Sequence, residues 1–134
     1  MQNSYTNRLL SFKKSLENLK SAKTADKDNY IILSGVIMIY NLTFDLAWKL
    51  IKDVLIDVYG ISDFPSGSPK ETLKKAESVD LIDNNIWIDM LNDRNELMHD
   101  YDYNVATEKY DRIVNHYLLI FEKLLEKVEN IDSK

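Results

Sequence analysis

The sequence predicts an all-α protein, an up-and-down bundle of four or five helices, on three observations. Its 134 residues include only three glycines and two prolines, the residues that most often interrupt helices. Apolar residues recur at three- and four-residue spacings, whereas the alternation typical of strands is scarce. No internal repeat or linker divides the chain, so we expect a single helical domain over residues 1–134.

The first predicted helix is amphipathic, and the second is largely apolar. Residues 5–23 predict a helix with an apolar inner face and a basic outer face. Residues 29–59 predict the dominant helix, with Asn29 as N-cap and Gly60 as the C′ residue that stops it. Because apolar residues occupy more than one of its faces, we expect a central helix or one that also contributes to a dimer interface.

The segment 60–69 is the clearest loop, since it holds two of the three glycines and both prolines. Its end reads Ser68, Pro69 and Glu71, the pattern of a capping box with proline at the first helical position. These residues predict the start of a short helix that ends at about Val79.

Two further helices complete the predicted bundle. The fourth starts near Asn84 and continues through IWIDMLNDRNELMH, and the turn YDYN follows it. The last spans about Val105 to Asn130 and carries apolar residues along its inner face. His116 lies among those apolar positions, and we expect it to be structural or at the surface.

Composition indicates the compartment. The chain has no cysteine, so disulfides and thiolate chemistry are excluded. The N-terminal segment has no apolar run of the signal-peptide kind. The longest charge-free apolar run, residues 30–44, is shorter than the roughly 20 residues that span a bilayer. We therefore expect a soluble cytoplasmic protein with no membrane segment.

The charges are unevenly distributed around a formal net charge of −5. Residues 1–25 carry five basic residues and one acidic residue, whereas residues 77–111 carry ten acidic residues and two basic ones. Affinity for nucleic acids depends mainly on cations that neutralise phosphates. The acidic segment therefore disfavours strong RNA binding by this region alone, and it suits a basic partner surface.

The stretch DRNELMHDYDY, residues 93–103, brings together Arg94, His99 and Tyr101. Guanidinium binds phosphate through two donors, and imidazole titrates near neutral pH. Such groups could cleave RNA without a metal. A base would take the 2′-hydroxyl proton, a cation would stabilise the phosphorane-like transition state, and an acid would protonate the leaving 5′ oxygen. One histidine does not easily serve as both base and acid, whereas a symmetric dimer brings two.

Helical geometry alone does not bring this pair together. On an ideal helix Arg94 and His99 lie roughly 140° apart. They converge only if the helix ends or bends between them, or if two protomers build the site. A helix exit starting at Asp100 would permit the first arrangement, and Asn95 shares a helix face with His99.

Structural interpretations of the same residues stay open. Arg94 could pair with Asp89, Asp93 or another acid. His99 could favour the dipole at a helix C-terminus, and Tyr101 could pack against the last helix.

A metal site is a second alternative. Asp89 and Asp93 lie four residues apart, with His99, Asp100 and Asp102 downstream, and these ligands could hold Mg²⁺ or Mn²⁺. The spacing matches no recognised metal motif, and nothing resembles a P-loop, a dinucleotide fingerprint or a serine nucleophile elbow. We therefore expect no metal and no cofactor.

Several sequence blocks resemble one known family. They are FDLAWKLIKDVL at 44–55, SPKETLKKAESVDLID at 68–83, WIDMLNDRNELMHDYDYNVA at 87–106, and the YxxI and YxxxFE patterns within 110–122. In order and spacing the chain is similar to the nucleotidyltransferase substrate-binding-protein-like family of the HEPN superfamily. The resemblance implies a dimeric up-and-down bundle and a cognate small nucleotidyltransferase as partner.

The resemblance also implies site residues. In related proteins an R-x4-H pair forms a metal-independent RNase site at the dimer cleft of a toxin. The nucleotidyltransferase is the antitoxin, and it adenylylates the tyrosine of R-x4-H-x-Y. These roles correspond to Arg94, His99 and Tyr101, with Asn95 and Asp93 as polar support.

The leading hypothesis is thus a toxin of a toxin-antitoxin pair. The alternative is a non-catalytic subunit that binds a nucleotide or another substrate for the transferase, and a third interpretation is a scaffold whose motif stabilises a dimer.

Overall fold

The computed structural model describes residues 4–83 and 85–132, and the side chains of residues 5–83 and 85–131. The described residues contain helices and no strand, which confirms the predicted all-α bundle. The elements in chain order are α1 (Ser4–Lys20), the 3₁₀ turn η1 (Ser21–Thr24), α2 (Tyr30–Asp57), α3 (Pro69–Ser78), α4 (Ile86–Leu97), α5 (Tyr103–Arg112), the π-helical turn η2 (Ile113–Tyr117) and α6 (Leu118–Asp132).

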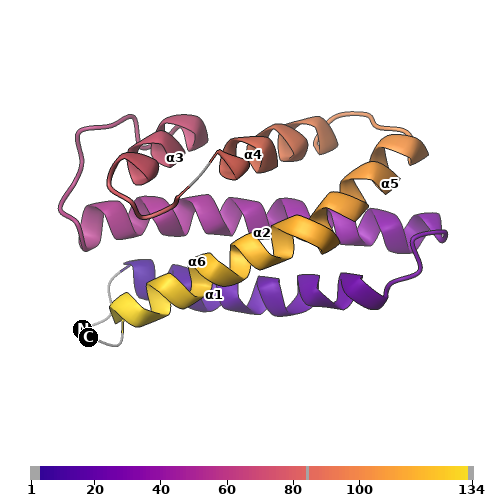
Figure 1. Ribbon diagram of the computed structural model, residues 1–134, viewed down its shortest axis with the longest axis horizontal. Helices are drawn as coiled ribbons and strands as arrows, with labels where there is room; N and C mark the ends of the chain where they lie inside the picture. The colour runs from indigo at the N-terminus through magenta and orange to yellow at the C-terminus, as the bar shows by residue number, and fades with distance from the viewer. Residues whose placement is uncertain (1–3, 84, 133–134) are drawn as a thin grey trace.

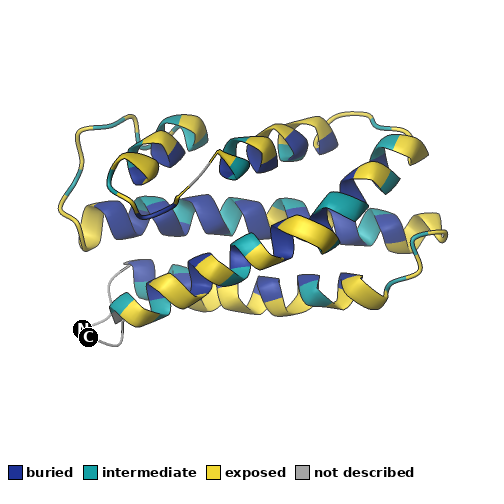
Figure 2. Ribbon diagram, in the orientation of Figure 1, coloured by how far each residue is buried: buried dark blue, intermediate teal, exposed yellow. Residues whose placement is uncertain are grey.

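Helix α2 is the centre of the bundle (Figure 1). It packs against α1, α3, α4 and α5, while α6 packs against α1. Buried residues recur along its whole length (Figure 2). The sequence predicted this position, because a helix that is apolar on several faces must be covered on several sides.

Among the described residues, α2 is also the helix long and apolar enough to cross a membrane by length and composition alone, with a mean hydropathy of 1.6 over its best window. Core helices of soluble proteins have the same properties. Its packing against α1, α3, α4 and α5 buries 44% of that window inside the bundle.

Aromatic rings fill the core where α2, α4 and α6 meet. Tyr40 stacks on Tyr117 at 5.8 Å between ring centroids and lies 6.0 Å from Phe121. Trp87 meets Phe121 edge-on at 5.8 Å. The Tyr40 hydroxyl donates to the backbone carbonyl of Met90 at 2.8 Å, so a polar group at the centre of the core is satisfied.

Local capping residues delimit the helices largely as predicted. The Asn29 side chain caps α2 by accepting from two backbone amides of its first turn, at 3.0 and 3.2 Å. Gly60 has a φ of +69°, in the left-handed region that favours glycine. Helix α2 itself ends earlier than predicted, at Asp57. The Ser68 hydroxyl accepts from the Glu71 amide at 3.3 Å, which is one of the two hydrogen bonds of a capping box.

The later helices differ from prediction in their boundaries and in one turn, and α4 ends at Leu97 and not at the predicted His99. The predicted start near Asn84 lies outside the described residues, and α4 begins at Ile86. The last helix begins at Tyr103 rather than Val105, because the Asp102 side chain accepts from the Val105 amide at 2.8 Å and caps it. The π-helical turn η2 within this helix has no counterpart in the predicted pattern.

One face of α2 stays uncovered. Ile31, Met38 and Leu42, hereafter the α2 stripe, are 81%, 69% and 54% exposed. Their spacing of seven and four residues places them on one side of the helix. Buried residues such as Leu33, Ile37, Tyr40 and Phe44 lie on the faces of α2 that pack inside the bundle.

We predict that Tyr40→Phe lowers the free energy of unfolding by about 1 kcal/mol, because it removes one buried hydrogen bond and keeps the ring packing. Urea denaturation would measure the change. Tyr59→Phe, at a 39% exposed tyrosine after α2, is the matched control and should change little. Equal effects of the two substitutions would contradict a specific role for the Tyr40 hydroxyl.

Candidate functional site

The predicted motif lies where α4 ends. We call residues 98–102 the exit turn. The Met98 amide bonds the carbonyls of Arg94 at 3.1 Å and Asn95 at 3.3 Å, and the His99 amide bonds that of Glu96 at 3.2 Å. These contacts tighten and end the helix between Arg94 and His99. The helix end required for the two side chains to converge is therefore present.

The Arg94 guanidinium is held against α2. Nη2 forms an ion pair with Asp45, Nη1 donates to the Asn95 side chain at 2.7 Å, and the guanidinium lies 5.8 Å from the centre of the Phe44 ring. The side chain is 15% exposed, and its Nε is buried without a hydrogen-bond partner among the described residues. The partner carboxylate thus comes from α2, and neither Asp89 nor Asp93 supplies it.

His99 and Tyr101 differ from Arg94 in their surroundings. The His99 side chain is exposed, and it has no hydrogen-bond or ion-pair partner in the described part of the chain. Tyr101 is half-buried and packs against the core. No hydrogen bond links Arg94 to His99 within this protomer, so an anchored cation on α4 precedes an exposed imidazole in the exit turn.

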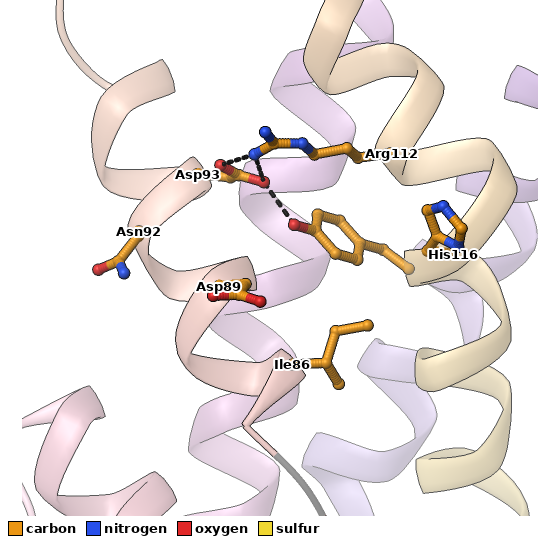
Figure 3. A pocket seen from close by; sticks show the side chains of 7 residues that line it. Ile86, Asp89, Asn92, Asp93, Arg112 and His116 are labelled. Carbon is orange, nitrogen blue, oxygen red and sulfur yellow. Dashed lines mark hydrogen bonds and ion pairs between the residues drawn. The ribbon is translucent and has the colours of Figure 1, made fainter.

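Asp93 precedes Arg94 in α4 but contacts α5 and η2, whereas Arg94 contacts α2. Its carboxylate accepts from Arg112 at 2.8 and 3.1 Å and from Lys109 at 2.8 Å, and the Tyr117 hydroxyl also donates to it (Figure 3). Asp93 and Lys109 are both almost completely buried. This Asp93 network joins α4 to α5 and η2, a structural role beyond the polar support predicted for Asp93.

The network perturbs the pKa of its members. Burial alone would raise the pKa of Asp93, but hydrogen bonds from Lys109, Tyr117 and Arg112 outweigh burial and lower it. Burial opposes the charge on Lys109, yet its bonds to Asp93 and Glu96 raise its pKa. The folded structure therefore favours the ionised forms of Asp93 and Lys109.

An open cavity of about 530 Å³ lies beside this network, between α4 and η2 (Figure 3). Its lining residues are Ile86, Asp89, Asn92, Asp93, Arg112, His116 and Tyr117. Sequence reasoning assigned no site role to the last three. The sequence feature that could have indicated these residues is the block YDRIVNHY, whose polar residues interrupt an apolar helix face.

The acidic residues considered as metal ligands do not assemble. No group of three or more His, Asp or Glu side chains able to hold a metal ion occurs in the described part of the chain. Asp93 instead binds two cationic side chains.

We predict that Asp93→Asn lowers the free energy of unfolding by roughly 3–5 kcal/mol, because it leaves Lys109 buried without its main counter-charge. Folding lowers the pKa of Asp93, so its contribution is present above the unfolded value of about 3.9 and is lost as the pH falls through the folded-state pKa. Denaturation at neutral pH and across the acid range measures both effects.

The matched control is Asp63→Asn, which removes an exposed ion pair with Lys75 and should change stability little. Similar losses of unfolding free energy for both variants would contradict the role of the network. So would an unfolding free energy of Asp93→Asn that falls as steeply in acid as that of the wild type.

Comparison with known proteins assigns the family. Residues 3–130 match the family model described as nucleotidyltransferase substrate binding protein like. A crystal structure of a Thermus thermophilus protein superimposes with a TM-score of 0.71 at 23% identity, covering 89% of this chain and 96% of that one. This likeness supports the fold alone, and no curated protein matches. The chain belongs to the nucleotidyltransferase substrate binding protein like family.

Proposed function

We propose that this chain is the helical subunit of a two-component nucleotidyltransferase, and that it binds a substrate and presents it to a catalytic partner. The main support is the ion pair between Arg94 and Asp45, which already neutralises the guanidinium of the motif. A phosphate ligand would have to displace this carboxylate. The exposed acids of residues 77–111 suit a basic surface on the partner.

The test mixes the purified chain with a small nucleotidyltransferase from the same genome. Transferase activity should rise several-fold, whereas the chain alone leaves RNA intact. Asp100→Lys reverses an exposed charge in the exit turn and should weaken the complex about tenfold, mainly through slower association. Glu126→Lys, an exposed position on α6, is the control. The absence of any gain in activity would contradict this function.

A second candidate is a metal-independent RNase toxin of a HEPN type. One observation favours it: α4 ends between Arg94 and His99, and the imidazole is exposed and unpartnered among the described residues. In a homodimer, one His99 could act as base and the other as acid, with Arg94 exchanging Asp45 for the phosphate. The exposed α2 stripe supports contact with a second copy of the chain.

For this candidate we predict cleavage of mixed RNA in EDTA by wild-type protein and none by His99→Ala. His116→Ala changes the other exposed histidine and should cleave normally. Asp45→Asn should increase cleavage, because it releases the guanidinium for phosphate. Absence of cleavage by all four folded proteins would exclude the RNase and leave the substrate-binding subunit.

Adenylylation of Tyr101 would regulate the same site. The tyrosine oxygen would attack the α-phosphorus of ATP and release pyrophosphate, leaving a negative phosphodiester in the exit turn that carries His99. This charge would compete with substrate for Arg94. We predict that the partner transferase labels wild-type protein and Tyr103→Phe with AMP but not Tyr101→Phe. Labelling of Tyr101→Phe would place the modification elsewhere.

A further inference from the structure

The cavity between α4 and η2 is separate from the exit turn, since neither Arg94 nor His99 lines it. Its volume of about 530 Å³ lies within the range of small-molecule sites, which is roughly 300–1,000 Å³. Helix α4 forms one wall through Ile86, Asp89 and Asn92 (Figure 3). The opposite wall belongs to the last helix and includes its π-helical turn.

The π-helical turn shapes this opposite wall. Residues 113–117 form η2, and its last two residues, His116 and Tyr117, both line the cavity. A π-helical turn holds more residues than an α-helical turn, so successive side chains diverge less and can face the same space. Such turns are uncommon and often occur at functional sites. This deviation from a regular helix lies at the cavity and not at the exit turn.

The cations beside the cavity are already paired. Arg112 binds Asp93 through Nη1 and Glu108 through Nη2, the latter at 2.7 Å. Lys109 binds Asp93 at 2.8 Å and Glu96 at 3.2 Å. Two cations therefore face three carboxylates here, and the wall offers little positive charge to a phosphate or a carboxylate ligand.

The polar groups on the α4 wall are unpaired. The exposed side chains of Asp89 and Asn92 have no hydrogen-bond or ion-pair partner among the described residues. The Asp89 carboxylate is an acceptor for N–H donors, whereas the Asn92 amide points away from η2 (Figure 3). Ile86 adds an apolar surface to the same wall. A carboxylate binds a charged N–H donor more strongly than a neutral one.

From these charges and contacts we infer that the cavity binds a small organic cation. Its ammonium or guanidinium group donates to Asp89, and its carbon chain contacts Ile86. The inference deepens the proposed function. It rests on that function only where it identifies the bound cation as the substrate presented to the transferase. Binding itself needs only the cavity.

The experiment is isothermal titration of the isolated chain at low ionic strength with agmatine and spermidine. Both should bind, and 1,4-butanediol, an uncharged chain, should not. Asp89→Asn should weaken binding about tenfold or more, because it removes a charge-assisted hydrogen bond. Glu77→Gln removes another exposed carboxylate, on α3, and should bind as wild type does.

A lysine or arginine side chain of another protein carries the same ammonium or guanidinium group. A second arm of the experiment therefore titrates N-acetyl-lysine amide and N-acetyl-arginine amide. Weaker binding of these amides than of agmatine and spermidine supports a free small-molecule cation, and binding of the amides alone overturns it. Asp89→Lys, at the same exposed position, is a second variant and should abolish binding, and circular dichroism confirms that each variant is folded.

Three results would overturn the site: no heat of binding at millimolar cation, equal binding by Asp89→Asn and wild type, or equal losses for Asp89→Asn and Glu77→Gln. Because the titration contains no transferase, the two proposals fail separately. Cation binding without transferase stimulation would leave the cavity standing, and stimulation without cation binding would leave only the subunit function.

Discussion

The buried carboxylate of Asp93 is the constraint on which the rest of the structure depends. It is almost fully removed from water and is balanced by Lys109 and Arg112, with the Tyr117 hydroxyl as a further donor. A buried charge is tolerated only where its partners are held in place. The short helix α4 is therefore fixed against α5 and η2, and the wall of the cavity is fixed with it.

The neighbouring residue fixes α4 from the other side. Arg94 follows Asp93 directly, yet its guanidinium binds Asp45 on α2. Two consecutive charged residues thus hold one helix between the central helix and the last one. Helix α4 ends at Leu97, three residues after Arg94, and the exit turn with His99 and Tyr101 follows. Packing and the candidate site are therefore not independent in this molecule.

The ion pairs also decide which ligands the molecule can attract. Arg94, Lys109 and Arg112 are all bound to carboxylates within the protomer. An anionic ligand must compete with them, whereas a basic surface or an organic cation meets exposed acids. This balance is the reason that we propose a substrate-binding subunit before a nuclease.

The sequence by itself determined the helices, since their signals are local. Periodicity placed α2 at the centre, and Asn29 and Ser68 cap their helices as predicted because each bonds amides two or three residues away. It also singled out Arg94, His99 and Tyr101 by residue type and spacing. Only the tertiary structure decided their partners. Asp45 lies 49 residues from Arg94, and Arg112 lies 19 from Asp93. Such pairs, and the cavity between α4 and η2, exist only after packing brings distant helices together, because no local pattern encodes which distant residues meet.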